Sequence, residues 1–146
     1  MPANPSYLQK FSCFRDLSEE QRKAVAKWAT AICFPPGYVL FEEGGPGDHL
    51  YLLSKGEVEI FYHIGEANLV KVDLLSGDEV IGCSALVPPF TYTDTASCRT
   101  EVEVLDLDAE RIRSLMKENC AVGFAIQQQI IRTLLDRITD LRLEVQ

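Results

Sequence analysis

Residues 37–58 read GYVLFEEGGPGDHLYLLSKGEV, and this stretch decides the fold class of the chain. Apolar and polar residues alternate on both sides of a cluster of turn-forming residues at 44–48, GGPGD. Glycine adopts backbone angles with positive φ that other residues avoid, so this cluster marks a tight turn between two strands. Gly56 marks a second turn a few residues later. Closely spaced turns between alternating segments predict a compact antiparallel β structure.

The same pattern extends outward, from Tyr38 to about Leu107. Residues 58–62 alternate in polarity, residues 69–75 follow a turn, and residues 102–107 form a last alternating segment. We expect roughly seven or eight short strands in this region. Short strands with frequent turns are typical of a β-sandwich or a rolled jelly-roll barrel.

Helical segments flank the β region. Residues 1–10 form an expected N-terminal extension with a frayed start, because two prolines interrupt it. Ser18 is a candidate N-cap, and Gln21 follows at the spacing of a capping box. The sequence predicts that this helix continues to about Ala31. On the other side of the strands, Asp108 is a candidate N-cap for a short helix.

A longer helix begins near Cys120, and its apolar residues recur at spacings of three and four. They form an a/d seam over roughly two heptads: Ile131, Leu134, Ile138, Leu141 and Val145. This stripe either packs on the chain's own barrel or pairs with a second copy in a parallel homodimer. We expect the homodimer, because the seam is longer than one small barrel can cover. Residues 11–119 would then be a β-roll with flanking helices, and residues 120–146 the dimerisation helix.

Composition excludes several classes of function. A chain of 146 residues has the length of one domain, and 47% hydrophobic with 25% charged residues is typical of a globular protein. The net charge is 14 − 22 = −8, which opposes binding to the phosphate backbone of nucleic acid. No apolar run could span a bilayer, and no signal peptide is visible. We therefore expect a cytoplasmic protein with no direct nucleic-acid or membrane partner.

The sequence shows no pattern typical of a catalytic or metal-binding site. The five cysteines are odd in number and form no C-x-x-C pair, so we expect free thiols in a reducing cytosol. His49 and His63 lack partners at ligand spacing, which argues against a zinc site. No nucleophile is paired with a base in the sequence. We therefore expect neither a metal, a cofactor nor an enzymatic activity.

The opening stretch resembles the cyclic-nucleotide-binding domain of the catabolite-activator (CRP/FNR) type. The family pattern G-x(6)-G-x(3)-D-x(2)-Y-x(4)-G-x-V is matched, in order, by Gly37, Gly44, Asp48, Tyr51, Gly56 and Val58. Residues that also fit the family on either side are Phe14, Leu17, Gly77 and Gly82. The resemblance covers roughly residues 11–145. It implies a mainly β fold with flanking helices: a double-stranded β-helix, or jelly-roll β-roll, with an N-terminal helix and a long C-terminal helix.

The resemblance also implies a regulatory function, a small-molecule ligand and a dimer formed through the last helix. CRP/FNR regulators carry a helix-turn-helix after that helix. This chain ends at Gln146, so we expect either a free-standing sensor or a piece of a longer regulator.

A ligand pocket is placed by the same resemblance. The pocket residues implied are Val72, Leu74, Val80, Gly82, Cys83, Ser84, Ala85, Asp94, Thr95, Ala96 and Ser97. In the family, the amides of a short helix and a nearby Arg hold the cyclic phosphate, and a Glu holds the ribose hydroxyl. Here Cys83 stands in place of the Glu, and Asp94 stands in place of the Arg. No Arg or Lys lies between Lys71 and Arg99, so a shift in alignment cannot restore the missing cation.

A carboxylate at the position of the family's Arg would oppose a phosphate. Two like unit charges about 4 Å apart repel by about 4 kcal/mol at an effective dielectric constant near 20. Three functions follow. The expected one is a sensor whose pocket does not take a cyclic nucleotide in the family's manner. The alternatives are a cyclic-nucleotide binder that uses hydroxyls such as Thr93, Ser84 and Ser97 instead, and a ligand-free dimerisation or protein-interaction module with a filled pocket.

Overall fold

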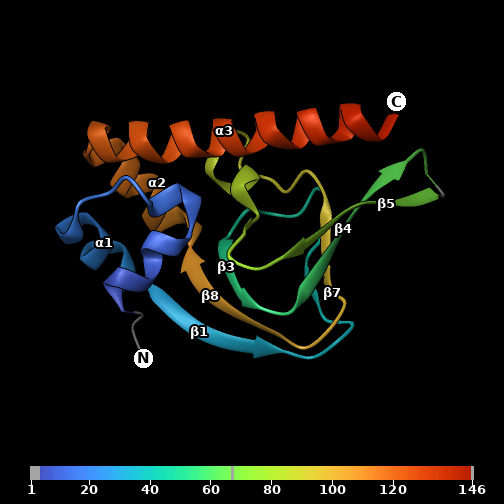
Figure 1. Ribbon diagram of the computed structural model, residues 1–146, viewed down its shortest axis with the longest axis horizontal. Helices are drawn as coiled ribbons and strands as arrows, with labels where there is room; N and C mark the ends of the chain where they lie inside the picture. The colour runs from blue at the N-terminus through green and yellow to red at the C-terminus, as the bar shows by residue number, and fades with distance from the viewer. Residues whose placement is uncertain (1–3, 67, 146) are drawn as a thin grey trace.

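The computed structural model describes residues 4–66 and 68–145 (Figure 1). Its strands form two four-stranded antiparallel sheets, which confirms the jelly-roll fold with flanking helices. In order across the first sheet lie β1 (Ala29–Phe34), β8 (Val102–Asp108), β3 (His49–Lys55) and β6 (Val80–Ile81). Across the second sheet lie β2 (Val39–Phe41), β7 (Thr95–Cys98), β4 (Glu57–Ile64) and β5 (Asn68–Ser76).

Helices gather at one end and along one side of the barrel (Figure 1). They are the 3₁₀ segments η1 (Pro5–Lys10), η2 (Ser12–Phe14) and η3 (Cys83–Leu86), and the α-helices α1 (Glu19–Ala26), α2 (Ala109–Glu118) and α3 (Cys120–Val145). The long helix α3 extends along the molecule, and its C-terminal end lies towards the β4–β5 hairpin (Figure 1). Its N-terminal half packs on η2 and α2.

Both predicted N-caps are confirmed. The backbone N–H of Gln21 donates to Ser18 Oγ at 3.2 Å, and the Gln21 side chain accepts from the Ser18 N–H at 2.8 Å, which completes a capping box. Asp108 Oδ1 accepts from the N–H groups of Glu110 and Arg111 at the start of α2. These caps satisfy backbone donors that the helices leave unpaired, so they define where each helix starts.

The predicted end of the first helix was wrong. The helix ends at Ala26 rather than near Ala31, and residues 29–34 form β1 instead. β1 pairs with β8 over its whole length, from Ala29 opposite Leu107 to Phe34 opposite Val102. An antiparallel partner along the whole strand outweighs a weak local helix preference, because the ladder satisfies the backbone groups of β1 that face β8.

The start of the described chain is packed rather than frayed. Residues 5–10 form η1, and the side chains of Leu8 and Phe11 are fully buried in the main hydrophobic core. The aromatic ring of Tyr7 stacks edge-on against Phe11, with the ring centroids 5.6 Å apart. Burial of apolar side chains stabilises this segment despite its prolines.

Strand β3 lies at the centre of the core. The four successive residues from Leu50 to Leu53 are all buried, although alternate side chains of a strand point to opposite faces. One face of β3 therefore points into the barrel, and the other is covered by flanking elements. This double burial explains why the decisive stretch of sequence is so apolar after its turn.

Candidate functional site

A cavity of about 270 Å³, which we call the central cavity, lies between the barrel and α3. Its barrel wall comes from the ends of β4, β5 and β6, from η3, and from the segment that precedes β7: Ile60, Leu75, Val80, Ile81, Gly82, Cys83, Ser84, Val87, Thr93 and Asp94. Its other wall is α3, through Ile130, Leu134 and Arg137. Smaller hollows of about 160 Å³ and 200 Å³ share residues with it. Apolar walls with a few convergent polar groups are typical of ligand sites.

Five of the residues implied by the resemblance meet in this cavity. They are Val80, Gly82, Cys83, Ser84 and Asp94. Segments more than ten residues apart in sequence therefore converge on one volume. The fold brings them together because β6 and η3 lie at the same end of the barrel as the segment before β7.

The other implied residues lie near the cavity or behind it. Val72 lines the adjoining hollow of about 200 Å³, and Leu74 is half-buried on β5 opposite Glu59. Ala85 and Ala96 are fully buried in the core. The remaining two residues, Thr95 and Ser97, lie on β7. Thr95 Oγ1 accepts a hydrogen bond from the backbone N–H of Glu43 at 3.0 Å, and Ser97 pairs with β2 and β4.

Gly82 sets the position of η3 against the cavity. Its φ is 89°, in the left-handed region that favours glycine. A Cβ atom there would lie 3.2 Å from the Tyr92 ring and 3.3 Å from the Phe41 ring. The Tyr92 hydroxyl is held in turn, because it donates to the His49 carbonyl at 2.7 Å and accepts from the His49 N–H at 2.9 Å. Glycine at this position therefore allows η3 to approach the barrel closely.

Arg137 is the functional candidate that sequence reasoning missed. It reaches the cavity from α3, and its Nε lies 4.0 Å from Oδ2 of Asp73 on β5. The family's phosphate-binding Arg belongs to the barrel, whereas Arg137 comes from a helix folded back over it. The sequence holds a signal in the spacing: Ile126, Ile130 and Arg137 are four and seven residues apart, which places them on one helical face, and the structure buries the two isoleucines there.

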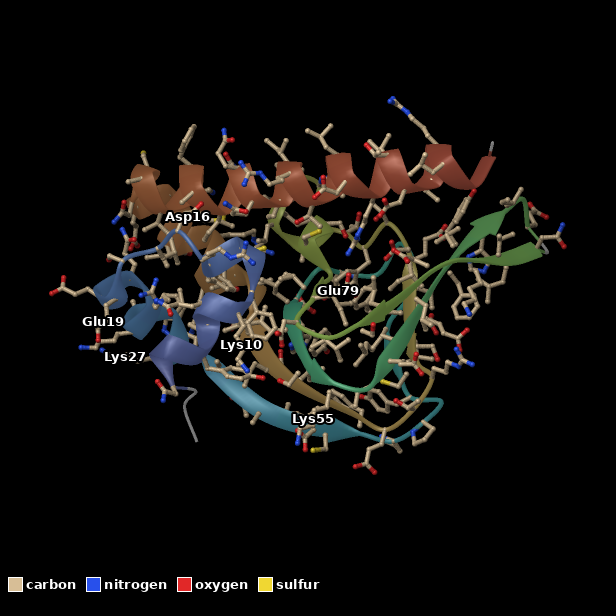
Figure 2. The ribbon with its side chains drawn as sticks, viewed as in Figure 1. Lys10, Asp16, Glu19, Lys27, Lys55 and Glu79 are labelled. Atoms are coloured by element: carbon tan, nitrogen blue, oxygen red, sulfur yellow. The ribbon has the colours of Figure 1, made fainter. Side chains whose placement is uncertain are left out.

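Carboxylates surround Arg137. Burial raises the pKa of Asp94, the nearby charges of Glu43 and Asp73 raise it further, and the positive charge of Arg137 partly opposes the shift. Burial also raises the pKa of Glu79, which Figure 2 shows beneath α3, while a hydrogen bond from the Ser76 N–H and the charge of Arg137 act against that shift. Among the described residues that line the cavity, Arg137 carries the one positive charge.

Cys83 does not have the environment of a reactive thiol. Burial raises its pKa, and Asp94 adds to this effect, while Arg137 opposes it. A raised pKa keeps the thiol protonated, and the protonated form is a poor nucleophile. Within the described part of the chain, no group of three or more His, Cys, Asp or Glu side chains is placed to hold a metal ion.

The seam of α3 is only partly covered by the chain's own barrel: Leu134 lines the cavity, and Leu141 lines the adjoining hollow of about 200 Å³. The side chains of Ile131, Leu134, Ile138 and Leu141 are between 44% and 51% exposed, and the side chain of Val145 lies outside the described residues. The inward face is different: Ile126 is fully buried there. Gln129 on the same face donates to Asp16, whose side chain lies beside α3 in Figure 2. Of the described helices, none combines the length and apolarity required to cross a membrane.

Comparison with known proteins places the chain among regulatory domains. The sequence model of the family described as "Cyclic nucleotide-binding domain" matches residues 31–119. A CRP-like cAMP-activated global transcriptional regulator of Mycobacterium tuberculosis is 25% identical over 131 residues, which are 90% of this chain. A regulatory subunit of cAMP-dependent protein kinase from Aspergillus fumigatus is 38% identical over 111 residues, or 76% of this chain.

A solved structure is similar over nearly its whole length. It is that of a candidate cyclic nucleotide-binding protein from Geobacter metallireducens, with a TM-score of 0.85 and 30% identity, and the similarity covers 93% of this chain and 98% of that one. The two relatives above are longer, since the matched region spans 57% of the bacterial regulator and 26% of the kinase subunit. The chain therefore matches only part of each of these two longer relatives.

Proposed function

Since this chain belongs to the cyclic nucleotide-binding domain family, we propose that it is a regulatory sensor domain whose pocket no longer takes a cyclic nucleotide in the family's manner. The observation that supports this most is Asp94, which lines the cavity where the resemblance expects the phosphate-binding Arg. A phosphate placed there would meet a carboxylate rather than a guanidinium.

Other carboxylates near Asp94 also oppose an anionic ligand. Asp73 and Glu43 add their negative charges to that of Asp94, and one guanidinium, Arg137, opposes them. A cyclic phosphate brings one further negative charge into this environment. Burial of an anion is costly unless the anion is paired and hydrogen-bonded. The cavity therefore favours a neutral or positively charged ligand.

The size of the cavity weighs against a purely structural module. A volume of about 270 Å³ with adjoining hollows is close to the lower limit of small-molecule sites, which is about 300 Å³. A filled pocket would have no such volume. This observation supports a sensor with a ligand over a ligand-free dimerisation module.

A second candidate function gains support from Arg137. This residue could hold a cyclic phosphate in place of the missing barrel Arg, because a guanidinium is a strong partner for phosphate. Binding would then require Arg137 to leave Asp73 and Asp94. In that variant mode, the cation would belong to α3 itself rather than to the barrel.

Calorimetric titration with cAMP and cGMP separates these candidates. We expect no binding by the natural chain at about 100 μM ligand, and micromolar binding by the Asp94→Arg, Cys83→Glu double variant. Asp136→Arg makes the same charge change as Asp94→Arg, on an exposed part of α3, and is the matched control for that substitution. Low-micromolar binding by the natural chain that Arg137→Met weakens by tenfold or more would support the variant mode and refute our first proposal.

We also propose that α3 pairs with a second copy in a homodimer. An a/d seam of four half-exposed described residues, next to the exposed Leu135 and Leu143, favours burial against an identical helix. Sedimentation at high micromolar concentration should give the dimer mass for the natural chain and for Thr139→Asp, and the monomer mass for Ile138→Asp. A monomer mass for the natural chain would end the dimer proposal.

A role in the cytoplasm without catalysis completes the proposal. The relatives named above are a regulator and a regulatory subunit, and the described cavity residues include no nucleophile paired with a base. Ligand occupancy would act by changing the position of α3, which forms one wall of the cavity. Turnover of a cyclic nucleotide by the purified protein would contradict this.

A further inference from the structure

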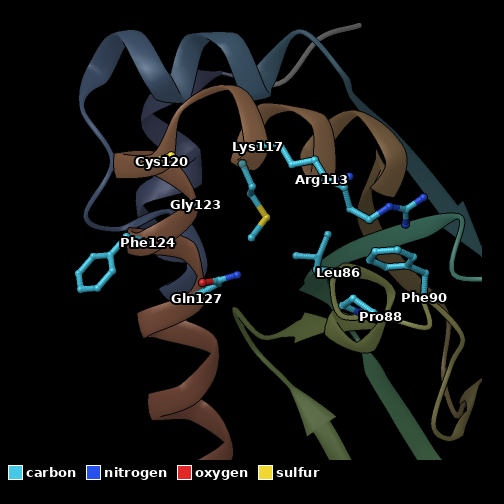
Figure 3. Close-up of a pocket in the computed structure, with 10 residues that line it drawn as sticks. Leu86, Pro88, Phe90, Arg113, Lys117, Cys120, Gly123, Phe124 and Gln127 are labelled. Carbon is cyan, nitrogen blue, oxygen red and sulfur yellow. The ribbon is translucent and has the colours of Figure 1, made fainter.

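A second hollow, of about 430 Å³, lies on a different part of the molecule and shares no lining residue with the central cavity. Figure 3 shows it between the start of α3, the end of α2, and η3 with the loop that follows. We call it the α2–α3 groove. Its principal walls are Leu86, Pro88, Phe90, Met116, Lys117 and Gln127.

Contacts of Arg113 hold the walls of the groove in position. Arg113 is the main strut: its guanidinium donates to the carbonyl of Gly47 at 3.0 Å and to that of Ala85 at 2.8 Å. The guanidinium carbon also lies 4.6 Å from the centre of the Phe90 ring. These contacts fix the loop after η3 to α2, so the positive charge of Arg113 is already engaged.

Phe90 is held in a rarely populated backbone conformation. Its φ is 61°, which is uncommon for a residue with a bulky side chain. The loop is secured by hydrogen bonds from the Phe90 N–H to Val87 and from the Gly47 N–H to the Phe90 carbonyl, both at 2.8 Å. Such conformations persist where surrounding structure imposes them, and they cluster at binding sites. The conformation places an aromatic ring on the wall of the groove.

The helices that form the opposite wall meet closely at Gly123. A Cβ atom at this position would lie 2.7 Å from the carbonyl oxygen of Met116, so a larger residue would push α3 away from α2. Met116 itself lines the hollow. Methionine is flexible and polarisable, and it adapts to the shape of an apolar ligand.

The free polar groups of the groove are a cation and an amide. Lys117 is exposed and forms no ion pair with any residue that the structure describes. Figure 3 shows the Gln127 side chain extending from α3 into the space between the two walls. Both can donate hydrogen bonds, and Lys117 adds a positive charge on a chain whose net charge is −8.

We propose that the α2–α3 groove is a second ligand site, for a small amphiphilic anion with an extended apolar body and one carboxylate head. The body would lie against Leu86, Phe90 and Met116, and the head would meet the Lys117 ammonium and the Gln127 amide. A volume of about 430 Å³ is within the range of small-molecule sites. The charge of Lys117 selects an anion over a neutral or cationic amphiphile. This inference does not depend on the function proposed for the central cavity.

Dodecanoate, below its micellar concentration, is the probe that tests the site. Cys33 and Cys120 are the exposed free thiols among the described residues, and Cys120 lies on the rim of the groove. In a Cys33→Ser background, the rate at which N-ethylmaleimide modifies Cys120 reports directly on occupancy. We expect saturable protection by dodecanoate, and weaker protection by dodecanol and by dodecyltrimethylammonium.

Variants assign the effect to the groove. Lys117→Gln should weaken dodecanoate binding by about threefold to fivefold, as expected for loss of a partly exposed ion pair. Gln127→Trp should abolish binding by blocking the groove, whereas Gln128→Trp, exposed on the same helix, should not. Equal protection by the cationic amphiphile, or unchanged affinity in Lys117→Gln, would overturn the proposal. A third result would also overturn it: Cys120 becomes protected as the protein concentration rises, and dodecanoate adds no further protection. In that case a second copy of the chain would cover the groove.

Discussion

Replacement of Arg137 by methionine tests how α3 is held over the central cavity. The Arg137 guanidinium lies 4.0 Å from the Asp73 carboxylate and also lowers the pKa values of Asp94 and Glu79. The contact with Asp73 ties the part of α3 beyond Ile131 to the barrel. Methionine keeps most of the side-chain length and removes the charge.

The strength of the Arg137–Asp73 ion pair follows from the distance between the two charges and from their exposure to solvent. Two unit charges at 4.0 Å attract by about 4 kcal/mol at an effective dielectric constant near 20. The side chains of Arg137 and Asp73 are 31% and 41% exposed, so solvent screens the pair. Exposed pairs contribute about 0.2–1 kcal/mol, and the additional carboxylates place Arg137 near the upper value. A loss of about 1 kcal/mol corresponds to about a fivefold increase in local opening.

Hydrogen exchange measured by mass spectrometry gives the comparison. We expect amides of residues 131–143 to exchange about fivefold faster in Arg137→Met, with little change in the barrel strands. Arg132→Met is the matched control, because Arg132 is exposed on the same helix and forms no ion pair with a described residue. All samples need the same protein concentration, since dimerisation would protect α3. Equal exchange in the two variants would refute the idea that the acidic wall holds the helix.

Three further predictions concern stability. Asp94→Asn should raise the free energy of unfolding at pH 7 by up to about 1 kcal/mol. The pKa of Asp94 is raised in the folded state, so ionisation of this carboxyl opposes folding. The gain in stability of Asp94→Asn should therefore disappear as the pH falls and the natural carboxylate becomes protonated. A gain in stability that persists in acid would contradict the burial argument. Gly82→Ala should cost about 2–4 kcal/mol in urea unfolding, whereas Gly37→Ala, with a similar φ of 86° but open space around it, should cost about 1 kcal/mol. Tyr92→Phe should lower stability by about 1–3 kcal/mol, because the backbone groups of His49 lose their partner; thermal melting that matches the natural chain would disprove this role.

Local sequence signals predicted much of the fold. The glycines of residues 37–58 and the alternation around them act over a few residues, so they indicated short antiparallel strands without knowledge of the partners. The caps at Ser18 and Asp108 are equally local, and both are confirmed. The first helix was predicted too long because β1 depends on β8, which lies some seventy residues away and offers a partner that no local pattern reveals.

The candidate site was predictable in part. Spacing brought Gly82, Cys83 and Asp94 to notice through the family resemblance, and the structure places all three at one cavity. Arg137 was missed because its role depends on the path of α3, and a charged residue on a helix usually faces solvent. The α2–α3 groove was missed for a similar reason, since its walls come from three separate elements.

The sequence by itself determined the class of fold, the family and the absence of a cation on the barrel side of the pocket, because each is written in residue types and short spacings. Only the tertiary structure decided the electrostatic balance of that pocket. The pKa values of Asp94, Glu79 and Cys83 depend on burial and on a guanidinium supplied by a distant helix. Desolvation and Coulomb interactions depend on distance in space, and the chain acquires those distances only when α3 folds over the barrel.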